Sequence, residues 1–145
     1  MALHCTMITP PLCVSRSLLV ALTVIPLWAG AQPASHPLLD QYRATARQEN
    51  PGFKDFSAAA GKTLYQTKRG DLACASCHTD NPRNAGRHAK TNKDIAPLSP
   101  AVNAKRFTDA ANVEKWFKRN CNDVLNRACT TQEKGDFMAY VLSVS

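Results

Sequence analysis

Apolar residues recur three or four positions apart in four stretches of the chain, which is the spacing of one face of an α-helix. We therefore predict helices over residues 37–48, 56–68, 109–120 and 130–142. No stretch alternates strictly between apolar and polar residues as a half-buried strand does, and the chain contains no internal repeat. This pattern predicts a small all-α domain.

Two of the predicted helices carry further local features. Thr130 and Glu133 stand three residues apart before an apolar run, which is the arrangement of a capping box at a helix start. The third helix carries Val113, Trp116 and Phe117 on the face that we expect to turn toward the core, with basic residues on the opposite face.

The first part of the chain differs from the rest. Residues 17–28 are almost all apolar and follow one basic residue, Arg16, while every acidic residue lies at position 40 or later. Small residues end this segment at Ala31, in the pattern of a signal-peptidase site. The apolar run is shorter than the roughly 20 residues of a membrane-spanning helix, and Pro26 interrupts it. We expect a signal peptide over residues 1–31, export to the periplasm, and no membrane span in the mature chain.

Length and charge narrow the possibilities further. The chain has 145 residues, 18 Lys and Arg against 11 Asp and Glu, and a formal net charge of +7. A chain of this length excludes large two-domain catalytic folds. We expect a leading helix and linker over residues 32–52 and one small domain over residues 53–145. Basic residues are not interleaved with stacking aromatic residues, so a nucleic-acid partner is not expected.

The segment 74–78 has the sequence CASCH, the pattern that attaches c-type haem. Cys74 and Cys77 supply the thiols that add to the haem vinyl groups, and His78 is placed to bind the iron as its proximal ligand. A redox-active C-x-x-C pair is the main alternative, but no strand pattern precedes this segment. A zinc site is the other alternative, and the spacing of Cys121 and Cys129 fits it poorly.

The residue on the other side of the iron cannot be identified from these patterns. The loop before the last helix contains no Met, and we expect Met138, inside that helix, to pack in the core. We expect His88 to be exposed in a polar loop, and His36 to be disordered near the mature N-terminus. Water, a side-chain oxygen, a Lys or no ligand at all remain open as the distal partner.

Cys121 and Cys129 would lie about 12 Å apart on a continuous helix, because each residue adds about 1.5 Å. A disulfide needs Cα atoms within roughly 7 Å, so the chain must turn between these two residues if they are joined. In an oxidising compartment we expect this disulfide rather than two free thiols.

Two further features resemble class I cytochromes c. Gly61 followed by Tyr65 is similar to the N-terminal helix of that class, where a Gly permits a close crossing of the C-terminal helix and an aromatic residue packs into the crossing. Residues 95–100 resemble the proline-bearing loop behind the proximal imidazole. This resemblance implies a class I cytochrome c-like fold with four or five helices around one covalent haem, and a carbonyl near Pro97 that accepts a hydrogen bond from Nδ1 of His78.

Residues 93–100, 105–109, 113–122 and 127–130 together resemble the sphaeroides haem protein (SHP) family. The resemblance covers most of residues 56–145. In that family an Asn directly before the disulfide Cys binds the ferric iron, which implies this role for Asn120, with Asn122 as its main competitor. The resemblance also implies transient oxygen binding on reduction and a dihaem cytochrome c as electron donor.

We therefore expect an exported soluble monohaem cytochrome that transfers electrons, with Asn120 leaving the iron on reduction so that O₂, NO or CO can bind. One alternative is an oxidase-like or peroxidase-like enzyme, and another is a gas or redox sensor that acts through a partner. The sequence leaves open whether the protein is an enzyme. Basic residues at positions 83, 87, 90 and 93 form either a solvated surface or a docking site for an acidic redox partner.

Overall fold

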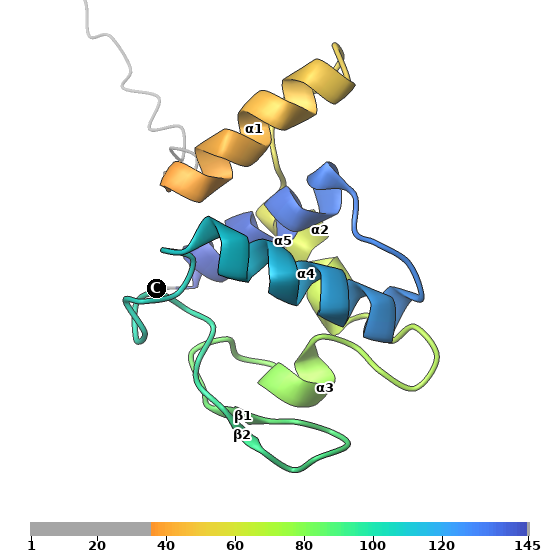
Figure 1. The fold of residues 1–145 in the computed structure, drawn as a ribbon, viewed down its shortest axis with the longest axis vertical. Coiled ribbons are helices and arrows are strands. Elements are labelled where there is room, and N and C mark those ends of the chain that lie inside the picture. The colour runs from red at the N-terminus through yellow and green to blue at the C-terminus, as the bar shows by residue number, and fades with distance from the viewer. Residues whose placement is uncertain (1–35, 145) are drawn as a thin grey trace, which may run out of the picture. The chain divides into compact units, whose positions relative to one another are not determined.

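The computed structural model describes residues 36–144, so the predicted signal peptide over residues 1–31 lies outside the described residues. Within this part, helices make up almost all the regular structure, which confirms the predicted all-α class (Figure 1). The elements are α1 (Pro37–Glu49), α2 (Ala58–Gln66), α3 (Ala75–His78), β1 (Gly86–Arg87), β2 (Asp94–Ile95), α4 (Ala110–Leu125) and α5 (Thr131–Ser143).

Helices α2 and α5 form the most extensive helix pair, and their crossing depends on Gly61. A Cβ atom at this position would lie 1.8 Å from the carbonyl oxygen of Asp136 in α5. Tyr65, one turn further along α2, is fully buried and packs against Tyr140 and Phe137 with ring centroids 5.3 and 6.1 Å apart. Both roles inferred for Gly61 and Tyr65 are confirmed.

Helix α5 begins as predicted, with a complete capping box between Thr130 and Glu133. It is the central helix of the core, because its residues from Gly135 to Val141 are buried and α1 also packs against it. Met138 is fully buried in this core, in agreement with the expected packing role.

Helix α4 differs from its prediction in length. Its N-cap is Asp109, the first residue of the predicted range, but the helix continues beyond Asn120 to Leu125, where the C-cap Asn126 has a left-handed φ of 55°. The apolar face also continues past the predicted end, since Phe117 and Cys121 are buried and Leu125 packs against the core. The chain therefore turns after Leu125, and Asn120 lies inside the helix.

Trp116 does not face the core as expected. Its side chain is 44% exposed, whereas Phe117 is buried and Val113 packs partly against the core. The guanidinium of Arg119 lies 5.6 Å from the centre of the Trp116 ring, close enough for a cation–π contact. The sequence predicted that Val113, Trp116 and Phe117 would all face the core, but only Val113 and Phe117 pack against it.

The loop after α3 contains a short antiparallel ladder in which Gly86 pairs with Ile95 and Arg87 with Asp94. Two residues per strand are too few to produce an alternating pattern, which is why the sequence did not predict them. Gly86 is required here, because a Cβ atom would lie 2.0 Å from the carbonyl oxygen of Cys77. Among residues 36–144, no helix combines the length and hydrophobicity needed to cross a membrane.

Candidate functional site

A cavity of about 620 Å³ lies between α4, the segment around α3, and the loop that carries β1 and β2. Its volume is within the range of small-molecule and cofactor pockets, roughly 300–1,000 Å³. Apolar side chains from several elements form much of the wall, and the chemistry comes from a few polar and sulfur-bearing residues. Of the residues named individually in the sequence analysis, those that line it are Cys74, Cys77, His78, His88, Lys90, Lys93, Val113, Trp116, Phe117, Asn120, Cys121 and Cys129.

Cys74 and Cys77 are placed at this cavity by α3, a helix of four residues. Ser76 fixes its first turn by accepting a hydrogen bond from the Ala73 amide at 3.0 Å. Both thiols are free and partly buried, and the amide of Ala89 donates to Sγ of Cys77 at 3.3 Å. Burial raises the pKa of Cys74 to about 11, so this thiol is neutral at physiological pH.

His78 ends α3 and lines the same cavity. Burial, with a smaller contribution from the nearby Arg106 guanidinium, lowers the pKa of His78 to about 4. The imidazole is therefore neutral at physiological pH and keeps a nitrogen lone pair, as a metal ligand requires.

The predicted hydrogen bond between His78 and the region of Pro97 is absent from this structure. The Pro97 carbonyl instead accepts hydrogen bonds from Nε of Arg106 at 2.7 Å and from Nδ2 of Asn103 at 3.1 Å. Two donors occupy the two lone pairs of this oxygen. Within residues 36–144, no hydrogen bond reaches the His78 imidazole. Arg106 had no distinguishing sequence feature, because a basic residue in a loop is usually solvated.

Asn120 and Asn122 occupy different surroundings although both lie in α4. The side chain of Asn120 is exposed and lines the cavity that His78 also lines, whereas Asn122 is not among the cavity-lining residues of the described part. Asn112, in the first turn of α4, lines the cavity as well. The structure thus brings Asn120 and His78 to one cavity and leaves Asn122 outside it.

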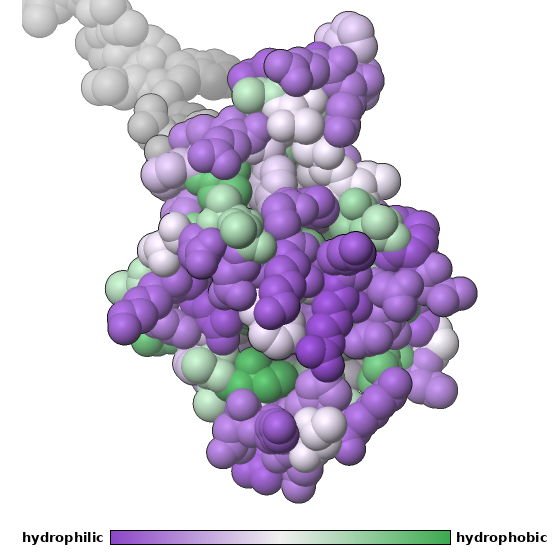
Figure 2. All heavy atoms as spheres, viewed as in Figure 1, coloured by the Kyte–Doolittle hydropathy of each residue, from purple (hydrophilic) through white to green (hydrophobic). Residues whose placement is uncertain are grey.

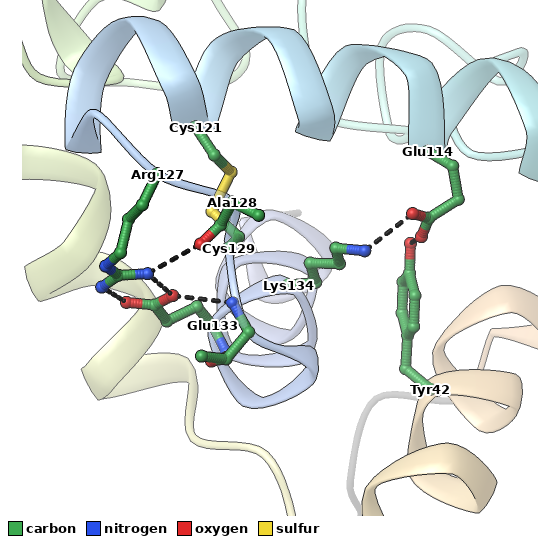
Figure 3. Close-up of a disulfide and its surroundings, with 9 residues drawn as sticks. Tyr42, Glu114, Cys121, Arg127, Ala128, Cys129, Glu133 and Lys134 are labelled. Carbon is green, nitrogen blue, oxygen red and sulfur yellow. Dashed lines mark hydrogen bonds and ion pairs between the residues drawn. A yellow bond between two sulfur atoms is a disulfide. The ribbon is translucent and has the colours of Figure 1, made fainter.

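Cys121 and Cys129 form a disulfide with a Cα–Cα distance of 5.6 Å (Figure 3). The turn between them begins after Leu125, and Arg127 lies in it with its guanidinium paired to Glu133 of α5 at 2.7 Å. Across α4, Glu114 accepts a hydrogen bond from the Tyr42 hydroxyl and pairs with Lys134 at 2.7 Å. These links attach both halves of α4 to the rest of the domain.

The two remaining histidines of the described part do not behave as expected. His88 is partly buried rather than exposed, and its Nδ1 accepts hydrogen bonds from the amides of Lys90 and Thr91, both at 3.2 Å. His36, expected to be disordered, is placed in this structure with its Nδ1 capping the start of α1 and its ring in contact with Phe107. Both imidazoles therefore have local structural roles.

The structure identifies further residues that the sequence did not single out for the site. Arg119 and Asp123 line the cavity beside Asn120, on the same helix. The Tyr65 hydroxyl lies within hydrogen-bond distance of the His78 and Thr79 carbonyls. The sequence placed Tyr65 at a helix crossing only, and no local pattern indicates which backbone a buried hydroxyl reaches.

These residues fit a covalently bound haem. Two thiols and a neutral imidazole line one cavity of suitable size, and its largely apolar wall suits a porphyrin. No group of three or more His, Cys, Asp or Glu side chains among the described residues could hold a bare metal ion, so a zinc site finds no support in that part.

Comparison with known proteins gives three consistent findings. Residues 51–141 match a family model described as a domain of unknown function, DUF1924. The chain is 42% identical over 111 residues to cytochrome c″ of Methylophilus methylotrophus, covering 73% of this chain and 77% of that protein. It is 48% identical over 69 residues to the cytochrome c-type protein SHP of Cereibacter sphaeroides, covering 48% of this chain and 53% of SHP.

Solved structures agree with these matches. Oxidised cytochrome c″ from M. methylotrophus superposes with a TM-score of 0.69 at 42% identity, covering 74% of this chain and 92% of that structure. Oxidised SHP, described as an oxygen-binding cytochrome c, superposes with a TM-score of 0.64 at 37% identity, covering 73% of this chain and 93% of that structure. A solution structure of cytochrome c″ is described as giving insights into haem-ligand detachment. It superposes with a TM-score of 0.65 at 42% identity, covering 73% of this chain and 90% of that structure.

Proposed function

Because this chain belongs to the family that contains cytochrome c″ and SHP, and is therefore a c-type cytochrome with a c-type haem as its cofactor, we propose that one haem is attached through Cys74 and Cys77 with His78 as its proximal ligand. The bound haem supplies an iron that exchanges one electron between its ferric and ferrous states. The neutral His78 imidazole supports this role, since a protonated ring has no lone pair to donate.

Asn120 is the proposed distal ligand in the ferric state. A neutral amide oxygen is a hard, weak donor that suits Fe(III) better than Fe(II). Reduction therefore favours release of Asn120, which leaves a position for O₂, NO or CO. The released amide can still donate a hydrogen bond to a diatomic molecule through its NH₂ group. The observation that carries this proposal is that Asn120 lines the His78 cavity while Asn122 does not.

The related proteins support this assignment. The structure of SHP is described as that of an oxygen-binding cytochrome c, and a cytochrome c″ structure is described in terms of haem-ligand detachment. An open or releasable coordination position is consistent with both descriptions.

The test compares ferric and ferrous absorption spectra of haem-loaded wild type, Asn120→Ala, Asn122→Ala and Asn112→Ala. We expect Asn120→Ala alone to change the ferric spectrum, because it removes a ligand. The ferrous spectra of all four proteins should respond to CO. A change in Asn122→Ala or Asn112→Ala with none in Asn120→Ala would overturn the assignment.

A second candidate function is reduction of O₂ or peroxide. Arg119 and Asp123 line the cavity beside Asn120, and a charged donor and a carboxylate near a ligand site are groups that assist cleavage of an O–O bond. Steady consumption of H₂O₂ or O₂ under continuous electron supply, lost in Asp123→Asn, would favour this function. Reduction without turnover would favour electron transfer.

The proposed electron donor is an acidic redox protein in the periplasm, and the SHP resemblance suggests a dihaem cytochrome c. Lys90, Lys93 and Lys105 are exposed and line the cavity, so they surround the site at which electrons would enter. The face of the domain drawn in Figure 2 is mainly hydrophilic, with small separate hydrophobic patches, which suits a transient encounter better than a permanent interface.

A further inference from the structure

Tyr65 connects the most closely packed helix pair to the segment that carries His78. Its ring is fully buried between α2 and α5. Its hydroxyl oxygen lies 3.0 Å from the carbonyl oxygen of His78 and 2.6 Å from that of Thr79, so the one hydroxyl hydrogen is within reach of both acceptors. A side chain of the rigid core thus holds the backbone at the end of α3.

The backbone at this point has few other restraints. Helix α3 has only four residues, and its last carbonyl groups have no partner within so short a helix. Thr79 follows with a φ of 63° and a ψ of 170°, a positive-φ conformation that a β-branched residue adopts rarely. Among residues 36–144, Tyr65 is the donor that reaches both carbonyls. The hydroxyl therefore stabilises an otherwise unfavourable end to the helix.

We propose that Tyr65 is a positioning residue for the proximal ligand, and this inference rests on the proposed function. By fixing the carbonyls of His78 and Thr79, its hydroxyl sets the orientation of the His78 imidazole toward the haem. The effect is transmitted through the backbone, because the imidazole itself has no hydrogen bond in the described part of the chain.

This role explains how the two axial ligands can behave differently. His78 is tied by Tyr65 to the α2–α5 pair, while Asn120 belongs to the part of the cavity wall that α4 supplies. On reduction the amide oxygen would be the weaker of the two ligands, and the Tyr65 contact would keep the imidazole in place. The proposal therefore predicts that weakening the Tyr65 contact changes the proximal side and leaves the fold intact.

The chain offers a matched control in Tyr140. It belongs to the same buried aromatic cluster, with its ring 5.3 Å from that of Tyr65, but its hydroxyl makes no hydrogen bond within residues 36–144. Tyr65→Phe and Tyr140→Phe thus remove the same atom from neighbouring rings. Only the first removes a donor from the backbone of His78 and Thr79.

The experiment records NMR spectra of the ferric, haem-loaded wild type and both variants, because hyperfine shifts of the haem methyl groups depend on the orientation of the axial imidazole. We expect Tyr65→Phe to change the methyl pattern. Hydrogen exchange at the amides of Cys77 and His78, which bond to the Cys74 carbonyl, should become about tenfold faster, since two partly buried acceptors lose their donor. Tyr140→Phe should match wild type in both measurements.

Equal spectra for all three proteins, or equal changes in both variants, would overturn the proposal. These ferric measurements do not depend on release of Asn120, so failure of the redox-gated site is detected separately by the CO experiment.

Discussion

Single atoms decide the closest contacts of this domain, and Gly61 is the clearest case. Helix propensity alone predicts that Gly61→Ala stabilises α2 by about 1 kcal/mol. The added Cβ would instead lie 1.8 Å from the backbone oxygen of Asp136 and 2.9 Å from Cβ of Tyr140. Backbone atoms of α5 cannot move aside without separating the two helices.

We therefore expect Gly61→Ala to lower the free energy of unfolding by about 3 kcal/mol, as overpacking of a core contact does. Denaturant unfolding of the haem-loaded protein measures this change. Gly52→Ala is the control, because its nearest neighbour is the Asn50 side chain at 3.3 Å, and its effect should stay within about 0.5 kcal/mol. A stabilised Gly61→Ala variant would show that the crossing is looser than described.

The residues of the site differ in how far the sequence reveals them. Cys74, Cys77 and His78 form a contiguous motif, so their spacing alone suggests their chemistry. The role of Asn120 could be inferred only from the resemblance to SHP, because an Asn near the end of a helix has no distinguishing pattern of its own. Tyr65 and Arg106 act on backbone carbonyls that lie far from them in sequence, and no local pattern encodes such contacts.

At the scale of elements, the start of α5 combines a capping box with an ion pair. Glu133 accepts a hydrogen bond from the Thr130 amide at 2.9 Å and binds the Arg127 guanidinium with both carboxylate oxygens (Figure 3). The hydrogen bond from Arg127 is the largest influence on the pKa of Glu133, which falls from 4.5 to about 2. Burial acts in the opposite direction, and the Thr130 amide lowers the pKa further.

A carboxylate whose pKa is lower in the folded state stabilises the fold above its unfolded pKa and loses that contribution as the pH falls. We expect the stability supplied by Glu133 to disappear between about pH 4.5 and pH 2. Glu133→Gln retains a capping side chain but has no charge, so its free energy of unfolding should depend less on pH across this range than that of wild type. Identical pH dependence in the two proteins would contradict the assignment.

The disulfide is the second element-scale feature, since it joins α4 to the segment just before α5. Closing this short loop stabilises the folded state by about 2–3 kcal/mol in the chain-entropy model. We expect Cys121→Ser with Cys129→Ser to lower the free energy of unfolding by this amount. The ferric spectrum should change as well, because Cys121 adjoins Asn120, the proposed ligand. A spectrum identical to that of wild type would show that the disulfide does not position Asn120.

Element types were predicted better than element ends. The patterns of α1, α2, α4 and α5 were all recognised, because each presents an apolar stripe to the core. The end of α4 was missed by several residues, since Cys121 and Leu125 continue its apolar face through a polar stretch. Trp116 shows the same limit, because periodicity gives an apolar stripe but does not tell which of its residues line a cavity instead of the core.

For the whole molecule, the basic side chains around the cavity give a prediction about encounter with a partner. We expect the rate constant for reduction by an acidic donor to fall severalfold as salt rises from about 20 to about 200 mM, because screening weakens the attraction between opposite charges. Lys90→Glu with Lys93→Glu should lower the rate at low salt. Lys54→Glu, which alters a residue outside the cavity wall, should have a smaller effect. A rate that does not depend on salt would contradict docking at this surface.

The central claim is that one axial ligand leaves when the iron is reduced. The most direct test is the absorption spectrum of the dithionite-reduced, haem-loaded wild type recorded before and after addition of CO. The account predicts a five-coordinate ferrous spectrum that changes at once to that of a CO complex. A six-coordinate, low-spin ferrous spectrum that CO leaves unchanged would contradict it.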